Sequence, residues 1–353
     1  VHDFDPLPYY DNPKEARRAD RSQQMATATA AMALEDAGEL SSDPARCGVI
    51  YATGVGGLQT FEEQVLVHDR KGERRVSPFM VPMIMPNAPG AAISMRFGLQ
   101  GPNETITTAC AASTHAIGYA TRLIQMGYAD VVVSGGTESV MSPVGMAGFQ
   151  NMTALSSSGQ SKPFDKDRDG FMMTEGSATL VLEEMSSAQS RGANIYGEVL
   201  GSGSTADAHH ITAPAPGGDG ALRCMQLAIE DSGLASTDIA SVNAHGTSTP
   251  LNDAAEAEAL SKLFGEDGPP VTSTKGVTGH ALGAAGAIEA TAVLLSFLHK
   301  QIPPTAGFVN RDPEMAGFNI VTGSGLEWEP GPSMSNSFGF GGHNGSIVLA
   351  PVN

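Results

Sequence analysis

The chain has 353 residues, which is enough for one large or two medium domains. It carries 20 Lys and Arg against 38 Asp and Glu, a formal net charge of −18, so we expect neither nucleic-acid binding nor attachment to an anionic membrane. We find no run of 18 apolar residues and no N-terminal leader pattern. Three scattered cysteines argue against a disulfide framework or a zinc site, and we expect a cytoplasmic protein.

Helical and strand patterns alternate along the chain. In chain order they predict a helix over 21–37, a strand over 47–52, a helix over 111–127, strands over 130–135 and 178–183, a helix over 218–233, a strand over 239–244, a helix over 252–264, a strand over 271–274, a helix over 284–299 and a strand over 346–350. This alternation predicts an α/β fold with largely parallel sheets, and the apolar strands suit sheets covered on both faces. We place a division near residue 199, between units 1–199 and 200–353.

Cys110 lies where a Thr/Ile run changes to helical spacing, in ETITTACAASTHAIG. This pattern places the thiol at the start of a helix, where the helix dipole and free N–H groups stabilise a thiolate and can hold an oxyanion. The alternative is a buried cysteine that packs as a small apolar residue. Cys47, at the start of a strand, and Cys224, in a helix, keep that second interpretation.

Two histidines follow predicted strands and lie beside glycines: His245 in VNAHGTSTP and His280 in TKGVTGH. Ligands of open α/β sheets usually bind at strand ends, and an imidazole can donate to a carbonyl oxygen or steady a carbanion. Lys275 lies five residues before His280, and Glu289 follows on a helix from which it can return to the lysine. Each histidine alone is more often structural, but two of them together with Cys110 favour an active site.

Three further histidines and a glycine-rich turn have plainer interpretations. We expect His115 to be structural, and the adjacent His209 and His210 point opposite ways on an extended chain, so no metal site is expected there. In SNSFGFGGHNG the glycines around Phe340 allow positive φ, which suits either a hairpin turn or a hinged gate over a pocket. No phosphate-binding glycine loop is present in the sequence.

The segments TACAAS, NAHGTSTP, KGVTGH and NSFGFGG together resemble signatures of the elongating β-ketoacyl-acyl-carrier-protein synthases, closest to the synthase II group. The resemblance covers essentially the whole chain. It implies a thiolase-like fold, with two related αβα halves in a five-layer αβαβα core, and a homodimer. It also implies a reaction: an acyl group moves from a carrier protein to the cysteine, malonyl-carrier protein loses CO₂, and the carbanion attacks the thioester, elongating a fatty acid by two carbons. No cofactor is required, and phosphopantetheine arrives on the carrier protein.

The resemblance also implies residue roles. His245 and His280 would hold the malonyl thioester oxygen, the N–H groups of Cys110 and Phe340 would form the oxyanion hole, and Lys275 would organise the site with Glu289. The pantetheine arm would meet Thr247 and Thr249. The acyl pocket would be lined by Val55, Phe149, Phe338, Phe340 and, from the partner subunit, Met80. A buried Na⁺ or K⁺ site would be formed by Asn243, Glu289, Ser335 and Asn336.

Two basic clusters match the docking regions for acyl carrier protein in that family, although each could simply be a solvated face. They are Lys14, Arg17 and Arg18, and then Arg70, Lys71, Arg74 and Arg75. Thr153 stands where the family has a basic residue, which predicts weaker or shifted docking there. His343 stands where many members have Thr. The family also begins with an additional strand that we place inside the N-terminal sheet, so we expect a truncated sequence and a gap in that sheet.

Several relatives remain as alternatives. A polyketide ketosynthase shares the triad and differs in acyl substrate and carrier. A biosynthetic thiolase uses a second cysteine near its C-terminus, which the FGFGG segment lacks, and the initiating synthases pair the cysteine with His and Asn. A chain-length-factor-like subunit lacks the nucleophile, so Cys110 argues against it. Acyl chain length stays open, because one or two methylenes change binding by only about 1–3 kcal/mol.

Overall fold

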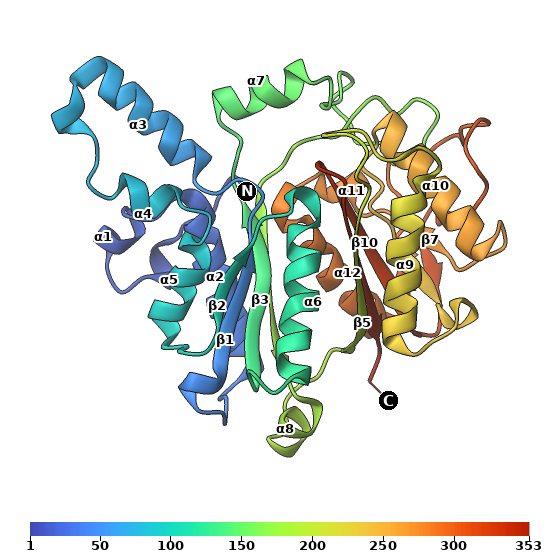
Figure 1. Cartoon of the computed structure of the whole chain (residues 1–353), viewed down its shortest axis with the longest axis horizontal. Coiled ribbons are helices and arrows are strands. Elements are labelled where there is room, and N and C mark those ends of the chain that lie inside the picture. Colours follow the sequence, from blue (N-terminus) through green and yellow to red (C-terminus); the bar gives the residue numbers. More distant parts are fainter. Residues whose placement is uncertain (353) are drawn as a thin grey trace.

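The computed structural model describes residues 1–352, which form two large mixed sheets and the helices that cover them (Figure 1). The first sheet has the order β2-β1-β3-β4 and the second the order β5-β11-β10-β6-β7. The strands are β1 (Cys47–Ala52), β2 (Asn103–Ile106), β3 (Val131–Glu138), β4 (Gly176–Glu183), β5 (Glu198–Ala206), β6 (Ser241–Asn243), β7 (Val271–Thr272), β10 (Ser333–Gly339) and β11 (His343–Ala350). A separate ribbon pairs β8 (Gln301–Ile302) with β9 (Leu326–Glu327).

Helices cover both sheets. They are α1 (Pro13–Ala16), α2 (Arg21–Ala37), α3 (Leu58–Lys71), α4 (Met80–Ile84), α5 (Ala88–Phe97), α6 (Ala112–Gln125), α7 (Pro143–Asn151), α8 (Met185–Ser190), α9 (Asp219–Ser232), α10 (Pro250–Phe264), α11 (Lys275–Thr278) and α12 (Ala285–His299). All five predicted helices and all six predicted strands are present, with ends that differ by up to three residues. The predicted division near residue 199 falls within the first residues of β5.

The expectation of largely parallel sheets is wrong, because both sheets are mixed. β1 runs parallel to β2 and β3, and β6 runs parallel to β7 and β10, but β4, β5 and β11 enter antiparallel. Between β10 and β11 the cause is the connection: three residues can close a hairpin but cannot make the long crossover that parallel strands need. The expected gap inside the first sheet is also absent, since β1 pairs with β2 on one side and β3 on the other.

The structure has five layers, as predicted. On β1, Val49 and Tyr51 pack with α2 and α5 on the outer face, while Ile50 and Ala52 pack with α6 on the inner face. α6 and α12 fill the space between the two sheets, and α9 and α10 cover the far face of the second (Figure 1). Each sheet is therefore buried on both sides, which explains its continuous apolar strands.

The central helices α6 and α12 meet at their N-terminal ends through small residues. Ala287 donates its N–H to Ser113 Oγ at 2.9 Å, and a Cβ on Gly286 would lie only 2.0 Å from Thr114 Oγ1. Residues Leu282–His299 are apolar and long enough, by composition and length alone, to cross a membrane, but here they pack between the sheets. The close crossing brings the segment before α6, which holds Cys110, next to the segment before α12, which holds His280.

Candidate active site

The turn that carries Cys110 joins a strand to a helix, as its sequence predicts. Cys110 lies in the 3₁₀ turn Ala109–Ala111, between β2 and the first residue of α6. Ala109 takes a left-handed φ of 50°, which turns the chain sharply into the helix. Gly339 packs directly on this turn, because a Cβ there would lie 3.0 Å from the Cys110 nitrogen. Only glycine lets the 339–342 turn lie this close to the nucleophile.

Three side chains from distant segments converge at the elbow. Cys110 Sγ and one ring nitrogen each of His245 and His280 lie within 4.8 Å of one another, and all three residues are buried. The two imidazoles meet edge to face with centroids 5.4 Å apart, and His280 also packs edge to face on Phe171. Such a set could hold a metal ion. However, the backbone N–H groups of Phe340 and Cys110 lie close enough to the sulfur to lower the pKa of the thiol, and such N–H groups are typical of an acyl-transfer site with an oxyanion hole.

A buried ion pair supports the first imidazole. Lys275 donates to Glu289, and Lys275 Nζ lies 3.4 Å from His245 Nδ1, with lysine and glutamate each 1% exposed. An ammonium can only donate, so His245 Nδ1 accepts and its neutral ring carries the proton on Nε2. Burial raises the pKa of Glu289 to about 7, although Lys275 acts in the opposite direction.

Burial also sets the protonation of the triad. It lowers the pKa of both His245 and His280 well below the usual value, and the Lys275 charge lowers it further, so both rings are neutral. It raises the pKa of Cys110 to about 12, even though Lys275 and the N–H groups of Phe340 and Cys110 lower it. Desolvation therefore outweighs the N–H groups that were expected to stabilise a thiolate, and it favours the protonated thiol.

Two acidic side chains that sequence reasoning missed hold the turn after β6. Glu256 accepts the N–H groups of His245 at 2.8 Å and Gly246 at 2.7 Å. Asp253, one turn earlier on α10, accepts the N–H groups of Ser248 and Phe164. Their three-residue spacing on an otherwise Ala-rich helix is the only signal that could have pointed to them.

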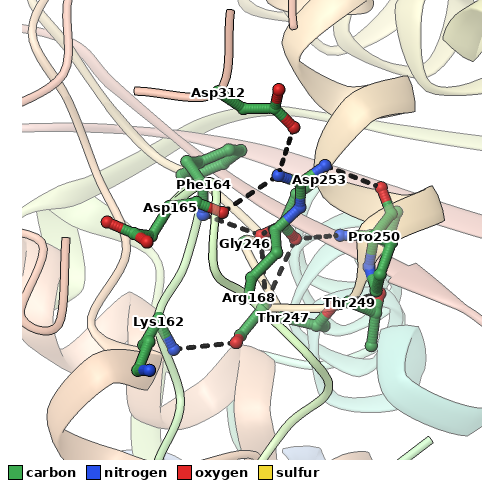
Figure 2. A network of polar contacts seen from close by, with 12 residues as sticks. Lys162, Phe164, Asp165, Arg168, Gly246, Thr247, Thr249, Pro250, Asp253 and Asp312 are labelled. Carbon is green, nitrogen blue, oxygen red and sulfur yellow. Dashed lines mark hydrogen bonds and ion pairs between the residues drawn. The ribbon is translucent and has the colours of Figure 1, made fainter. Parts of the chain in front are cut away.

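The arginine beside this turn completes the network (Figure 2). Arg168 is 6% exposed, lies 4.0 Å from the Asp253 carboxylate, and donates to Asp312 and to the Pro250 carbonyl. Ser248 takes a left-handed φ of 71°, and its hydroxyl accepts the Lys162 N–H at 2.7 Å. These contacts hold Ser248 between Thr247 and Thr249, whose hydroxyls lie 2.9 Å apart.

Glu138 is a third buried acid that the sequence did not single out. It accepts N–H groups from Gly54 at 2.7 Å and Gly283 at 3.0 Å, and the hydroxyl of Thr53 at 3.0 Å. Glu138 thus ties the turn after β1 to the turn before α12, beside Leu282 of the cavity wall.

A cavity of about 350 Å³ reaches the triad. Of the predicted positions, its wall contains Cys110, Phe149, His245, Thr247, Thr249, His280, Phe338 and Phe340. The Phe340 turn closes the β10–β11 hairpin, which confirms the hairpin interpretation, and it lines the cavity; a hinged gate stays a prediction. Asp169 and Asp207 are the acidic side chains in the wall, and no lysine or arginine of residues 1–352 lines it.

Two protein-family models match most of the chain. Residues 1–188 match the family model "Beta-ketoacyl synthase, N-terminal domain" and residues 196–309 match "Beta-ketoacyl synthase, C-terminal domain". The chain belongs to the β-ketoacyl synthase family. It is therefore a condensing acyltransferase, as the sequence motifs predict, and this family uses no bound cofactor.

Individual members of the family are similar over most of their length. The 3-oxoacyl-[acyl-carrier-protein] synthase 2 of Synechocystis is 45% identical over 360 aligned positions, which cover 99% of this chain and 86% of that protein. The ishigamide ketosynthase/chain length factor matches with a TM-score of 0.94 and 32% identity, over 100% and 87% of the two chains. A type II PKS ketosynthase, AntDE, in complex with its acyl-carrier protein AntF matches with a TM-score of 0.90 and 30% identity, over 94% and 85%.

Two predicted acyl-pocket positions lie outside the cavity of the single chain. Val55 is 44% exposed in the turn before α3, and Met80 is the first residue of α4. Met80 was predicted to act from the partner subunit, so its position here is compatible with that role. The cavity of one chain thus contains the positions predicted for the pantetheine arm and only part of the predicted acyl pocket.

The residues predicted for a cation site leave buried oxygen atoms unpaired. Asn243 and Ser335 are register partners on β6 and β10. Asn243 Oδ1, Ser335 Oγ and Glu289 Oε2 have no hydrogen-bond partner within residues 1–352, whereas Asn336 Oδ1 accepts from Ser346. Buried oxygens without donors are the ligand type that Na⁺ or K⁺ accepts, so these residues fit such an ion.

Both predicted basic clusters are exposed and lie on the side of the synthase formed by α1, α3 and α4 (Figure 1). The Arg18 guanidinium stacks 4.3 Å from the Phe79 ring centre, next to α4, while Arg74 and Arg75 lie in the turn between α3 and α4. His209 and His210 are exposed in the loop after β5, and neither lines the cavity.

Proposed function

We propose that this chain is a 3-oxoacyl-[acyl-carrier-protein] synthase, which condenses malonyl-acyl-carrier protein with an acyl group on Cys110 and so elongates fatty acids by two carbons. The observation that carries the proposal is a thiol beside two neutral, buried imidazoles at the end of a largely apolar cavity. The 45% identity to the Synechocystis synthase supports the same reaction.

In the first half-reaction the acyl group moves onto the nucleophile. A bond forms between Cys110 Sγ and the acyl carbon, the bond to the pantetheine sulfur breaks, and the thiol proton passes to that leaving sulfur. Because the resting thiol is protonated, this exchange needs no net proton from outside. The N–H groups of Cys110 and Phe340 stabilise the oxyanion that forms on the acyl carbonyl.

In the second half-reaction the malonyl group enters the same cavity. Its thioester oxygen accepts hydrogen bonds from His245 and His280, the carbon–carboxylate bond breaks to release CO₂, and the electron pair forms an enolate. The enolate carbon attacks the acyl-Cys110 carbonyl, the carbon–sulfur bond breaks, and the Cys110 thiolate that leaves takes up one proton from water, which restores the thiol. Neutral imidazoles suit this step because each can donate a hydrogen bond to the developing enolate oxygen. Thr247 and Thr249 hold the pantetheine arm, and Lys275 with Glu289 orients His245.

The proposal is tested by acyl transfer itself. We expect incubation with acyl-carrier proteins from butanoyl to octadecanoyl to add one acyl mass to the wild-type chain and none to Cys110→Ala, measured by intact-mass spectrometry. Cys224→Ala is the matched control, since this buried thiol of α9 lies outside the cavity, and it should acylate like wild type. Acylation of the Cys110→Ala chain would contradict the assignment of the nucleophile.

A polyketide ketosynthase is the second candidate function. It is supported by the similarity to the AntDE ketosynthase, which is bound to a hexaketide. The same mass measurement separates the two, because a polyketide enzyme would take up poly-β-keto groups from its own carrier and few or none of the saturated acyl groups.

We also propose that the two basic clusters dock an acidic acyl carrier protein, despite the net charge of −18. The support is that the clusters share one exposed side of the molecule. Arg74→Glu with Arg75→Glu is expected to raise KM for the carrier-bound substrate about tenfold, with a weaker dependence on salt, and to leave kcat nearly unchanged. Lys262→Glu with Lys300→Glu makes the same charge change on the other half and should change KM little. Equal KM changes in both variants would contradict docking at this site.

Three further features follow from the same proposal. We propose a cytoplasmic homodimer, supported by the three free cysteines and by apolar side chains exposed around α3, α4 and α5, among them Phe61, Val65, Leu66, Val81 and Met95. Sedimentation of a single-chain mass would contradict the dimer.

We propose that a buried Na⁺ or K⁺ is held by Asn243, Glu289, Ser335 and Asn336. Replacement of both ions by tetramethylammonium should lower the Tm, and an unchanged Tm would contradict the cation site.

A further inference from the structure

His115 links two segments that are far apart in the sequence: the turn before α6, at Thr108, and the start of β11, at Asn344. It lies on α6, five residues after the nucleophile, and is half-buried. Its Nδ1 lies 2.7 Å from Thr108 Oγ1, and its Nε2 lies 3.0 Å from the carbonyl oxygen of Asn344. One imidazole ring therefore joins the chain just before Cys110 to the start of β11.

The two partners select one tautomer. The Asn344 carbonyl can only accept, so His115 Nε2 carries the proton, and Nδ1 accepts from the Thr108 hydroxyl. Both contacts are satisfied by a neutral ring. Burial lowers the pKa of His115, although the Asn344 carbonyl acts in the opposite direction, so the neutral ring is the form present near pH 7. This bridge is stable throughout the working pH range of a cytoplasmic enzyme.

The bridged segments carry the two donors of the oxyanion hole. Thr108 precedes Cys110 by two residues, and Asn344 is the register partner of Phe338, two residues before Phe340. Between Phe340 and Asn344 the chain passes through Gly341 and Gly342, both with positive φ, so it has little stiffness of its own. Donors from two such segments stabilise an oxyanion only if their separation is held to a few tenths of an ångström.

The packing around the ring shows that it is fitted to this place. A Cβ on Gly345 would lie 3.0 Å from the His115 ring, so β11 has a glycine where the imidazole rests against it. One residue earlier on α6, Thr114 Oγ1 lies 2.7 Å from Ser337 Oγ on β10, which forms a second link between the same helix and the same hairpin. His115 is the link nearer to the turn that carries Phe340.

We propose that His115 is a positioning residue that sets the separation of the Cys110 and Phe340 N–H groups by tying Thr108 to Asn344. This inference rests on the proposed function, in which the hole serves acyl transfer while His245 and His280 serve decarboxylation. Loss of the bridge should therefore slow one half-reaction and spare the other. A purely structural role would lower both rates together, through loss of folded protein.

The experiment compares Thr108→Val, which keeps the shape but removes the hydroxyl, with Thr108→Ser, which keeps the hydroxyl. Single-turnover acylation of Cys110 by an acyl-carrier protein is followed by mass, and CO₂ release from malonyl-carrier protein is measured on the same preparations. Thr108→Val and His115→Phe are expected to slow acylation about tenfold with CO₂ release within about twofold of wild type, because full loss of one oxyanion donor costs about 100- to 1,000-fold and displacement costs less. Thr108→Ser should acylate at nearly the wild-type rate.

Three outcomes would overturn the inference: wild-type acylation in Thr108→Val, equal losses of acylation and CO₂ release, or a Thr108→Ser rate as low as that of Thr108→Val. The Thr108 pair decides the question even where His115→Phe fails to fold. A wild-type chain that takes up no acyl group from any donor is a separate result, and it would overturn the proposed function itself.

Discussion

A His280→Ala enzyme is expected to acylate Cys110 at nearly the wild-type rate but to release CO₂ from malonyl-carrier protein at least about 100-fold more slowly. His280 is 1% exposed and neutral, and it faces the triad from the turn before α12. Removing one preorganised donor to a developing negative charge typically costs about 100- to 1,000-fold in rate. The measurement is single-turnover CO₂ release, with intact mass reporting acylation in the same samples.

His299→Ala is the matched control for this prediction. His299 is exposed at the last residue of α12, so its loss should change neither rate. If the His280→Ala enzyme released CO₂ at the wild-type rate, His280 would have no role in the decarboxylation step. A parallel loss of acylation would instead show that the His280 ring, which also packs on Phe171, serves mainly to hold the cavity together.

The convergence of Cys110, His245 and His280 could be predicted from the sequence because its signals are local. Cys110, His245 and His280 each follow a strand and sit beside small residues that open a turn, and the turn type is readable from a few neighbouring letters. The crossing of α6 and α12 then brings these turns together. Each helix has small residues where the other must approach, as at Ser113 and Gly286.

The supporting acids could not be predicted in the same way. Glu138, Asp253 and Glu256 accept backbone N–H groups of turns from which they are separated in sequence, in the case of Glu138 by 84 and 145 residues. Nothing in the residues around Glu138 indicates which turn it will meet. The helix α3 was not predicted either: it buries only Thr60, and its apolar side chains Phe61, Val65 and Leu66 are exposed in the single chain.

Protonation was the least predictable property of the site. A cysteine at a helix start suggests a thiolate, and the structure does place N–H groups and Lys275 near the sulfur. The desolvation that reverses the outcome arises from both halves of the molecule, since the Phe340 turn, His245 and His280 all enclose the thiol. Its size depends on packing that no short segment encodes.

Replacing Lys275 with methionine is expected to destabilise the fold by about 3–5 kcal/mol at pH 8, because Glu289 is then left buried without its cation. Burial places the folded-state pKa of Glu289 near 7, above the unfolded value of 4.5, and loss of Lys275 would raise it further. When the pKa of a carboxyl is higher in the folded state than in the unfolded state, its contribution to the free energy of unfolding is fully present at low pH. This contribution is lost as the pH rises through the folded-state pKa. The loss in free energy of unfolding of Lys275→Met relative to the wild type should therefore be largest above pH 8 and should become smaller toward pH 5.

Urea unfolding at pH 5.5 and pH 8.5 checks this prediction, with two further variants. Lys275→Met combined with Glu289→Gln should recover part of the lost stability at pH 8.5, since no buried charge is left unpaired. Lys300→Met breaks the pair of Lys300 with Glu329, whose side chains are 62% and 88% exposed, and should cost less than about 0.5 kcal/mol at either pH. A Lys275→Met deficit that is equal at both pH values would show that lost packing of the lysine stem, rather than the unpaired Glu289 charge, causes the instability.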